Sequence, residues 1–251
     1  MALNFGGIGS INITSKKALR PWGIYKVKLT ETEEKSGQGK KDPTSTWKAL
    51  VLHFEGEEGT YQESIFYPKE GDDQRREVEN TDSKGNKYTT VLPSSLDQLQ
   101  CKMVHFIGVV GGKEAYETFA EKGAKLDCDS VMKLFKIILD KYVVGKEFYL
   151  KLTGRKEKKD GKETGNVYAM IPNIAAVNRT TQIAYCKENF VSVAPEVLGF
   201  NTWEIGQKHE YETRKPTVMK EASTSAVAEL VDSSKDKEVS EEDFDAMLNN
   251  L

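Results

Sequence analysis

The chain has 251 residues and a net charge of −3, from 36 Lys and Arg against 39 Asp and Glu. This length allows one large domain or two small ones, and 10 Phe, 10 Tyr and 3 Trp can form a hydrophobic core. No apolar run approaches the ~20 residues of a membrane-spanning helix, and the first residues lack the pattern of a secretory signal. The three cysteines are widely spaced, which argues against a disulfide framework and the usual zinc modules. We therefore expect a cytoplasmic protein without a metal or other cofactor.

Charge is distributed unevenly along the chain. Residues 221–251 carry nine acidic residues and two lysines, about −7, whereas the other 220 residues carry 34 basic and 30 acidic residues, about +4. This charge distribution indicates three possible roles for the acidic tail: it repels nucleic acid, it competes with nucleic acid for a basic groove, or it binds another protein. A tail that only keeps the protein soluble is the alternative. The composition beyond about residue 220 predicts disorder.

The first part of the chain predicts three strands. Residues 22–30 alternate between apolar and polar positions, which is typical of a half-buried strand. Residues 47–54 and 60–67 read as two more strands, joined by a short glycine-containing turn into a hairpin. The polar stretches 31–46 and 68–93 are expected to be loops.

The middle of the chain changes to helical spacing and then returns to strands. Apolar residues recur every three or four positions in 94–110, 113–123 and 129–144, and each of these segments is closed by a glycine. Alternation resumes in residues 147–153 and 166–171, which predict two further strands.

This order of elements predicts the fold class. Periodicity alone supports an α+β fold, mainly β, with antiparallel strands. Three strands, a helical insertion at about 94–144 and two strands fit a five-stranded oligonucleotide-binding (OB) barrel with helices between strands 3 and 4. We therefore expect an OB-like domain over residues 1–219, followed by a disordered acidic tail over 220–251.

A basic hairpin between the last two predicted strands is the strongest candidate for nucleic-acid contact. Residues 154–165 begin and end with glycine and are rich in Lys and Arg, which neutralise phosphates. Strand alternation places Tyr149, Lys151 and Tyr168 together on the outward face, where aromatic rings beside a lysine suit base stacking. A solvated hairpin, with each aromatic residue packed in the core, is the alternative. The candidate DNA-binding residues are Trp22, Tyr25, Trp47, Tyr149, Lys151, Arg155, Lys156, Lys158, Lys159 and Tyr168.

Catalytic motifs are missing from the sequence. The histidines His53, His105 and His209 belong to no recognisable catalytic or metal-binding pattern. Acidic residues are plentiful but show no diagnostic spacing. We therefore expect a protein that is not an enzyme, with a metal-dependent nuclease and a viral structural protein as the alternatives.

The end of the chain combines acidic and apolar residues. Phe244, Met247, Leu248 and Leu251 are spaced as one face of a helix. The polar spacer before them favours a peptide that docks in the groove of another protein over a helix packed on its own body. The candidate partner-binding residues are Asp243, Phe244, Asp245, Met247, Leu248 and Leu251.

With its strand order, basic hairpin and terminal EEDFDAMLNNL, the chain resembles the bacteriophage single-stranded DNA-binding proteins, which destabilise the DNA double helix during replication. The resemblance implies sequence-independent binding and protection of single-stranded DNA in phage replication, recombination and repair, in the host cytoplasm. It implies phosphate contacts by the five bases from Lys151 to Lys159, and stacking by Tyr149 and Tyr168. It also implies a tail that competes with DNA and recruits replication and recombination proteins such as a polymerase, helicase or primase.

Overall fold

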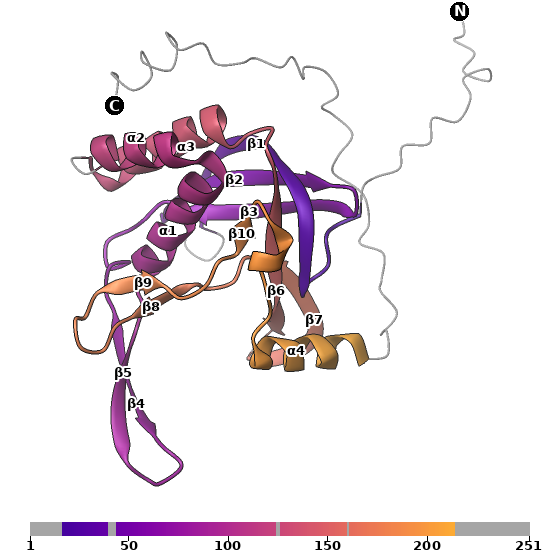
Figure 1. Cartoon of the computed structure of the whole chain (residues 1–251). Coiled ribbons are helices and arrows are strands. Elements are labelled where there is room, and N and C mark those ends of the chain that lie inside the picture. Colours follow the sequence, from indigo (N-terminus) through magenta and orange to yellow (C-terminus); the bar gives the residue numbers. More distant parts are fainter. Residues whose placement is uncertain (1–16, 40–43, 124–125, 160, 214–251) are drawn as a thin grey trace, which may run out of the picture.

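The computed structural model of the chain describes residues 17–39, 44–123, 126–159 and 161–213 (Figure 1). Its main sheet has the strand order β10-β6-β1-β2-β3, with β7 paired to β6. All ladders in this sheet are antiparallel. The strands of this sheet are β1 (Gly23–Gln38), β2 (Thr46–Gly56), β3 (Gly59–Phe66), β6 (Glu147–Lys159), β7 (Lys162–Met170) and β10 (Val191–Ser192).

The β1–β2 hairpin is longer than its sequence pattern predicts. The assignment of residues 31–46 to a loop is wrong for most of that stretch, because β1 continues to Gln38 and pairs there with Thr46. A register shift between Leu29 and Glu31 interrupts the ladder. Beyond it β1 is polar, with Thr32 its last buried residue, so this half of the strand shows no apolar alternation.

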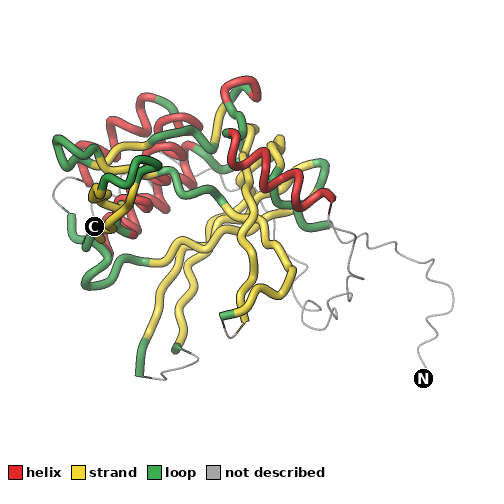
Figure 2. The backbone as a smooth tube through the Cα atoms, turned by 90° about the horizontal axis from the view of Figure 1, so that it is seen from below, coloured by secondary structure: helices red, strands yellow, loops and turns green. Residues whose placement is uncertain are grey.

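The β6–β7 hairpin is also mostly regular strand. The first half of β6 pairs with β1, whereas its second half, from Thr153 to Lys159, pairs with β7. The expected hairpin tip at 154–165 is therefore corrected, because β6 and β7 stay paired as far as Lys159 and Lys162. Figure 2 shows the β1–β2 and β6–β7 hairpins leaving the body toward the same side of the molecule.

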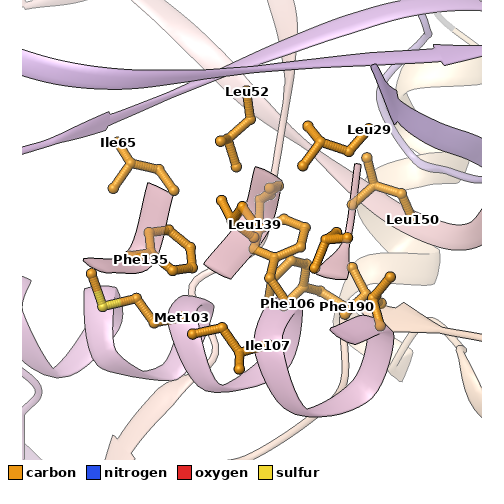
Figure 3. Packing of buried hydrophobic residues seen from close by; sticks show 14 of the residues in the cluster. Leu29, Leu52, Ile65, Met103, Phe106, Ile107, Phe135, Leu139, Leu150 and Phe190 are labelled. Carbon is orange, nitrogen blue, oxygen red and sulfur yellow. The ribbon is translucent and has the colours of Figure 1, made fainter. Parts of the chain in front are cut away.

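Helices cover one face of the sheet. α1 (Ser95–Val104) lies in the predicted helical segment 94–110. It is capped by Ser94, which forms a capping box with Asp97, and it continues as a π-helix, η1 (His105–Gly111). α2 (Lys113–Gly123) and α3 (Cys128–Tyr142) follow. Their apolar residues meet those of the strands in one buried core, in which Phe106 and Phe135 face Leu52 and Leu150 (Figure 3). The predicted helical insertion is thus present.

The segment between β3 and α1 holds a hairpin, although its polar sequence predicts a loop over residues 68–93. β4 (Arg76–Thr81) and β5 (Lys87–Leu92) pair as a separate two-stranded sheet and extend away from the body (Figure 1). Both strands are largely exposed and polar, so no buried face produces the alternation that identifies a strand.

After β7 the chain forms the β8–β9 hairpin (Ala175–Val177 and Ala184–Cys186), which contacts α1. Residues 187–213, called here the wrapping segment, follow with β10, a 3-10 turn η2 (Pro195–Val197) and α4 (Thr202–Thr213). β10 pairs with β6, and α4 contacts it. This wrapping segment therefore covers the face of β6 that is turned away from the core.

The fold is α+β with a mostly antiparallel sheet, as predicted. Over the described ranges no backbone ladder joins β3 to β7, so the sheet is open there. One contact crosses the opening, from the backbone amide of Ile171 to the hydroxyl of Tyr61 at 3.2 Å. None of the helices in the described part of the chain is long and apolar enough to span a bilayer.

Candidate nucleic-acid interface

A groove of about 770 Å³ lies between β3 and the β6–β7 hairpin. Residues 61–63 of β3 line one side, and residues 155–158 of β6 and 168–170 of β7 line the other. The groove therefore occupies the place where the sheet is open. The predicted basic hairpin therefore faces β3, the strand at one edge of the main sheet.

The hairpin side of the groove combines a cation with an exposed aromatic ring. Arg155 lies directly across the ladder from Tyr168, and Tyr168 is 54% exposed. The Tyr168 hydroxyl donates a hydrogen bond to Glu157 Oε1 at 2.8 Å, which raises the pKa of the tyrosine. An exposed ring beside a guanidinium is a platform for base stacking with a phosphate contact next to it.

The lysines of the hairpin differ in their surroundings. Lys158 and Lys159 are exposed. Lys156 is half-buried, and its ammonium lies 3.6 Å from Glu163 and 3.3 Å from Glu210 of α4. The basic end of the hairpin is therefore open to a ligand, whereas Lys156 is already paired with the chain's own carboxylates.

On the β3 side of the groove the negative charge of Glu63 is already balanced by a lysine of the protein. Glu63 accepts hydrogen bonds from Lys102 at 2.6 Å and from the hydroxyl of Tyr61. Burial of Tyr61, together with the adjacent Glu63 carboxylate, raises the pKa of the tyrosine. The Tyr61 ring stacks on Phe54 of the core at 5.9 Å between centroids. On this side of the groove the ring of Tyr61 is therefore part of the core packing.

Lys151 is a buried structural cation, and the expectation that it points outward is wrong. Its side chain is 0% exposed, and its ammonium lies 2.7 Å from Glu188 and 2.8 Å from Glu204. Phe200 adds a cation–π contact at 5.2 Å. The alternation along β6 predicts one buried face, but the wrapping segment buries the second face as well.

Trp22 and Tyr25 are likewise buried, and neither of them lines the groove between β3 and the β6–β7 hairpin. The Trp22 ring contacts Trp203 of α4 at 6.3 Å between centroids and lies close to Gly154. The hydroxyl of Tyr25 donates to the carbonyl of Arg20 at 3.0 Å. The interpretation of these two residues as DNA contacts is therefore corrected to core and rim packing.

Trp47 and Tyr149 lie outside the groove. The indole of Trp47 donates to the Gln38 carbonyl at 3.2 Å, and its ring meets Phe66 edge-on at 6.0 Å. Phe66 is 58% exposed, so this pair forms a second aromatic surface on β2 and β3. Tyr149 is half-buried, between Lys26 of β1 and Ser192 of β10 in the ladders.

No protein-family model, curated protein or solved structure matches the chain.

The remaining candidate residues divide by position. Arg155, Lys156, Lys158 and Tyr168 meet at the groove, and Lys159 lies at the hairpin tip beside it. The terminal peptide, residues 243–251, lies outside the described residues. In the part of the chain that the structure describes, no cluster of three or more His, Cys, Asp or Glu side chains is arranged to hold a metal ion.

The sequence pattern does not indicate the acidic and amide residues of the groove. Glu63 and Gln62 come from β3, and Glu157 lies between two basic residues of the hairpin. A single acid inside a basic run is the one signal that could have drawn attention to Glu157. The β3 residues can be recognised as part of the groove only when the arrangement of β3 beside β7 is known.

Proposed function

We propose that the chain binds single-stranded DNA, without sequence preference, in the groove between β3 and the β6–β7 hairpin. The observation that carries this proposal is the pairing of the exposed Tyr168 ring with Arg155, beside the exposed Lys158 and Lys159. A base stacks on Tyr168 while the neighbouring phosphates contact the basic residues.

The order of the strands supports an OB-like barrel as the framework. The path β3-β2-β1-β6-β7, with helices inserted between β3 and β6, has the order expected of such a barrel. In this proposal the opening between β3 and β7 is the binding groove of a partly open barrel. OB-type barrels bind oligonucleotides across their strand face and adjoining loops.

Stacking explains a preference for single strands over duplexes. The faces of bases in a duplex are covered by their neighbours, whereas an unpaired base offers its face to Tyr168. Binding therefore lowers the free energy of the single strand relative to the duplex, which melts hairpins and protects the unpaired DNA during replication, recombination and repair.

The last described helix ends near the basic hairpin. α4 ends at Thr213, and Glu210, one turn earlier, contacts Lys156. In the proposed function the acidic tail that follows in the sequence competes with DNA for the groove, and its terminal residues 243–251 recruit replication and recombination proteins when DNA displaces it. Deletion of residues 221–251 should tighten DNA binding, most strongly at low salt; unchanged affinity would remove the competition from the proposal.

A comparison of ligands tests the proposed function. Labelled dT oligonucleotides of about 30 nucleotides, an equal-length RNA and a blunt duplex are titrated with the full chain at several salt concentrations. The proposal expects the tightest binding to dT, with an affinity that falls steeply as salt rises. Equal or tighter binding to RNA would favour an RNA-binding module. Cleavage of the DNA in Mg²⁺ or Mn²⁺ would favour a nuclease, and large particles that ignore oligonucleotides would favour a structural protein.

A further inference from the structure

Glu157 is an acidic residue on the groove side of a basic hairpin. Electrostatics alone makes it unfavourable there, because a carboxylate repels the phosphates that Arg155 and Lys158 would attract. Its contacts give it a different role. Both of its carboxylate oxygens accept hydrogen bonds from β7.

Three donors of β7 converge on this carboxylate. Glu157 Oε1 accepts from the hydroxyl of Tyr168 at 2.8 Å. Glu157 Oε2 accepts from the Asn166 side-chain amide at 2.9 Å and from the hydroxyl of Thr164. These bonds stabilise the ionised carboxylate, and they lower its pKa, with the Thr164 bond contributing most.

The β6–β7 ladder has a bulge at Glu157, and hydrogen bonds to the Glu157 carboxylate cross it. The ladder pairs Lys156 with Val167 and Lys158 with Glu163, so one residue of β6 stands opposite three residues of β7. Gly165, in the middle of those three, has φ +89°, a conformation that favours glycine. The carboxylate therefore bridges the bulge and fixes the Tyr168 ring at the same time.

We infer that Glu157 is a positioning residue, which holds the Tyr168 ring ready to stack on an unpaired base. This inference rests on the proposed function and makes a prediction opposite to simple electrostatics. Removal of a negative charge from a phosphate-binding groove should tighten DNA binding. Removal of the anchor of a stacking ring should weaken it.

Fluorescence anisotropy with two labelled oligonucleotides separates the two effects. One is dT of about 15 nucleotides, and the other has the same length and phosphates but abasic sites in place of bases. For Glu157→Ala we expect affinity for dT to fall about fivefold, the equivalent of one hydrogen bond. Affinity for the abasic strand should stay equal or rise, because only the repulsion is removed.

Two further variants serve as controls. Tyr168→Phe keeps the ring and removes only its bond to Glu157, so it should weaken dT binding in the same direction and add little to Glu157→Ala. Glu163→Gln removes another acid of the hairpin, one that pairs with Lys156 instead of holding the Tyr168 ring. It should leave dT binding unchanged or tighten it.

The outcomes distinguish this inference from the function on which it rests. Tighter dT binding by Glu157→Ala overturns the positioning role and leaves DNA binding intact. Equal binding of dT and abasic DNA by the wild type also overturns it, because no base is then stacked. If the wild type binds neither strand, the proposed function fails and the positioning role fails with it.

Discussion

The ammonium of Lys151 lies 2.8 Å from the Glu204 carboxylate of α4 and 2.7 Å from Glu188. Lys151 and Glu204 are almost completely buried. This ion pair joins β6 to α4, the last described helix. It fixes the wrapping segment on the side of β6 opposite the core and so forms part of the support for the hairpin that lines the groove.

Lys151→Ala should therefore destabilise the fold strongly. It leaves Glu204 buried without its cation, and breaking a buried pair in this way costs about 3–5 kcal/mol of unfolding free energy. The measurement is urea unfolding followed by circular dichroism. Lys26→Ala is the matched control, since its pair with Glu147 is exposed and contributes little to stability. Equal losses in the two variants would show that the buried pair is not important.

Gly154→Ala should loosen the packing of the hairpin on Trp22. A Cβ at this position would lie 2.4 Å from the Trp22 indole nitrogen and 2.7 Å from Val167, so the side chains must shift. Overpacking of this kind costs about 1–3 kcal/mol, which should appear as a lower melting temperature. Gly199→Ala, where nothing lies within 4 Å of a Cβ, is the control. A melting temperature unchanged by Gly154→Ala would contradict the close approach of Trp22.

The Arg75–Asp97 pair should make stability depend on pH in the acid range. Hydrogen bonds from Arg75 at 2.8 Å lower the pKa of Asp97 to about 2, whereas an unfolded aspartate has a pKa of about 3.9. Because the folded pKa is the lower one, this contribution is full well above the unfolded pKa and is lost as pH falls through the folded pKa. Asp97→Asn should cost stability at about pH 6, and its difference from the wild type should shrink below about pH 4. A difference that stays constant down to about pH 2 would argue against the shifted pKa.

Arg155→Ala and Lys158→Ala should each weaken the dependence of DNA affinity on salt. The logarithmic slope should become shallower by about 0.7 for each phosphate of a single strand that the variant no longer neutralises. Lys122→Ala, on α2, is the control and should leave the slope unchanged. If all three variants keep the wild-type slope, phosphates do not contact this side of the groove.

Much of the fold follows from the sequence because one face of its elements is buried. The alternation around Val27 and Leu29, and the helical spacing around Phe106 and Phe135, each reflect contact with the single core. The predicted start of the first helical segment at residue 94 coincides with the Ser94 cap of α1. The parts of strands that extend beyond the core, such as the end of β1, have no buried face. Their polar sequence therefore predicts loops.

The candidate site is only partly visible in the sequence for a related reason. The basic run of the hairpin identifies Arg155 and Lys158, and the alternation identifies Tyr168. The same alternation wrongly predicts that Lys151 is exposed. Lys151 is buried by the wrapping segment, residues 187–213, which has no regular apolar period of its own. Glu63 reaches the groove only through the long-range arrangement of β3 and β7, which no local pattern encodes.

Photocrosslinking tests the central claim of a DNA-binding groove most directly. An oligonucleotide of about 15 dT residues, in which one base is replaced by 5-iodouracil, is bound to the full chain, irradiated and mapped by mass spectrometry. The proposal predicts a crosslink at Tyr168, which disappears in Tyr168→Ala while the labelled strand is still retained by the basic residues. A crosslink confined to other exposed aromatic residues, such as Tyr88 or Tyr185, or no crosslink at a concentration that saturates binding, would contradict it.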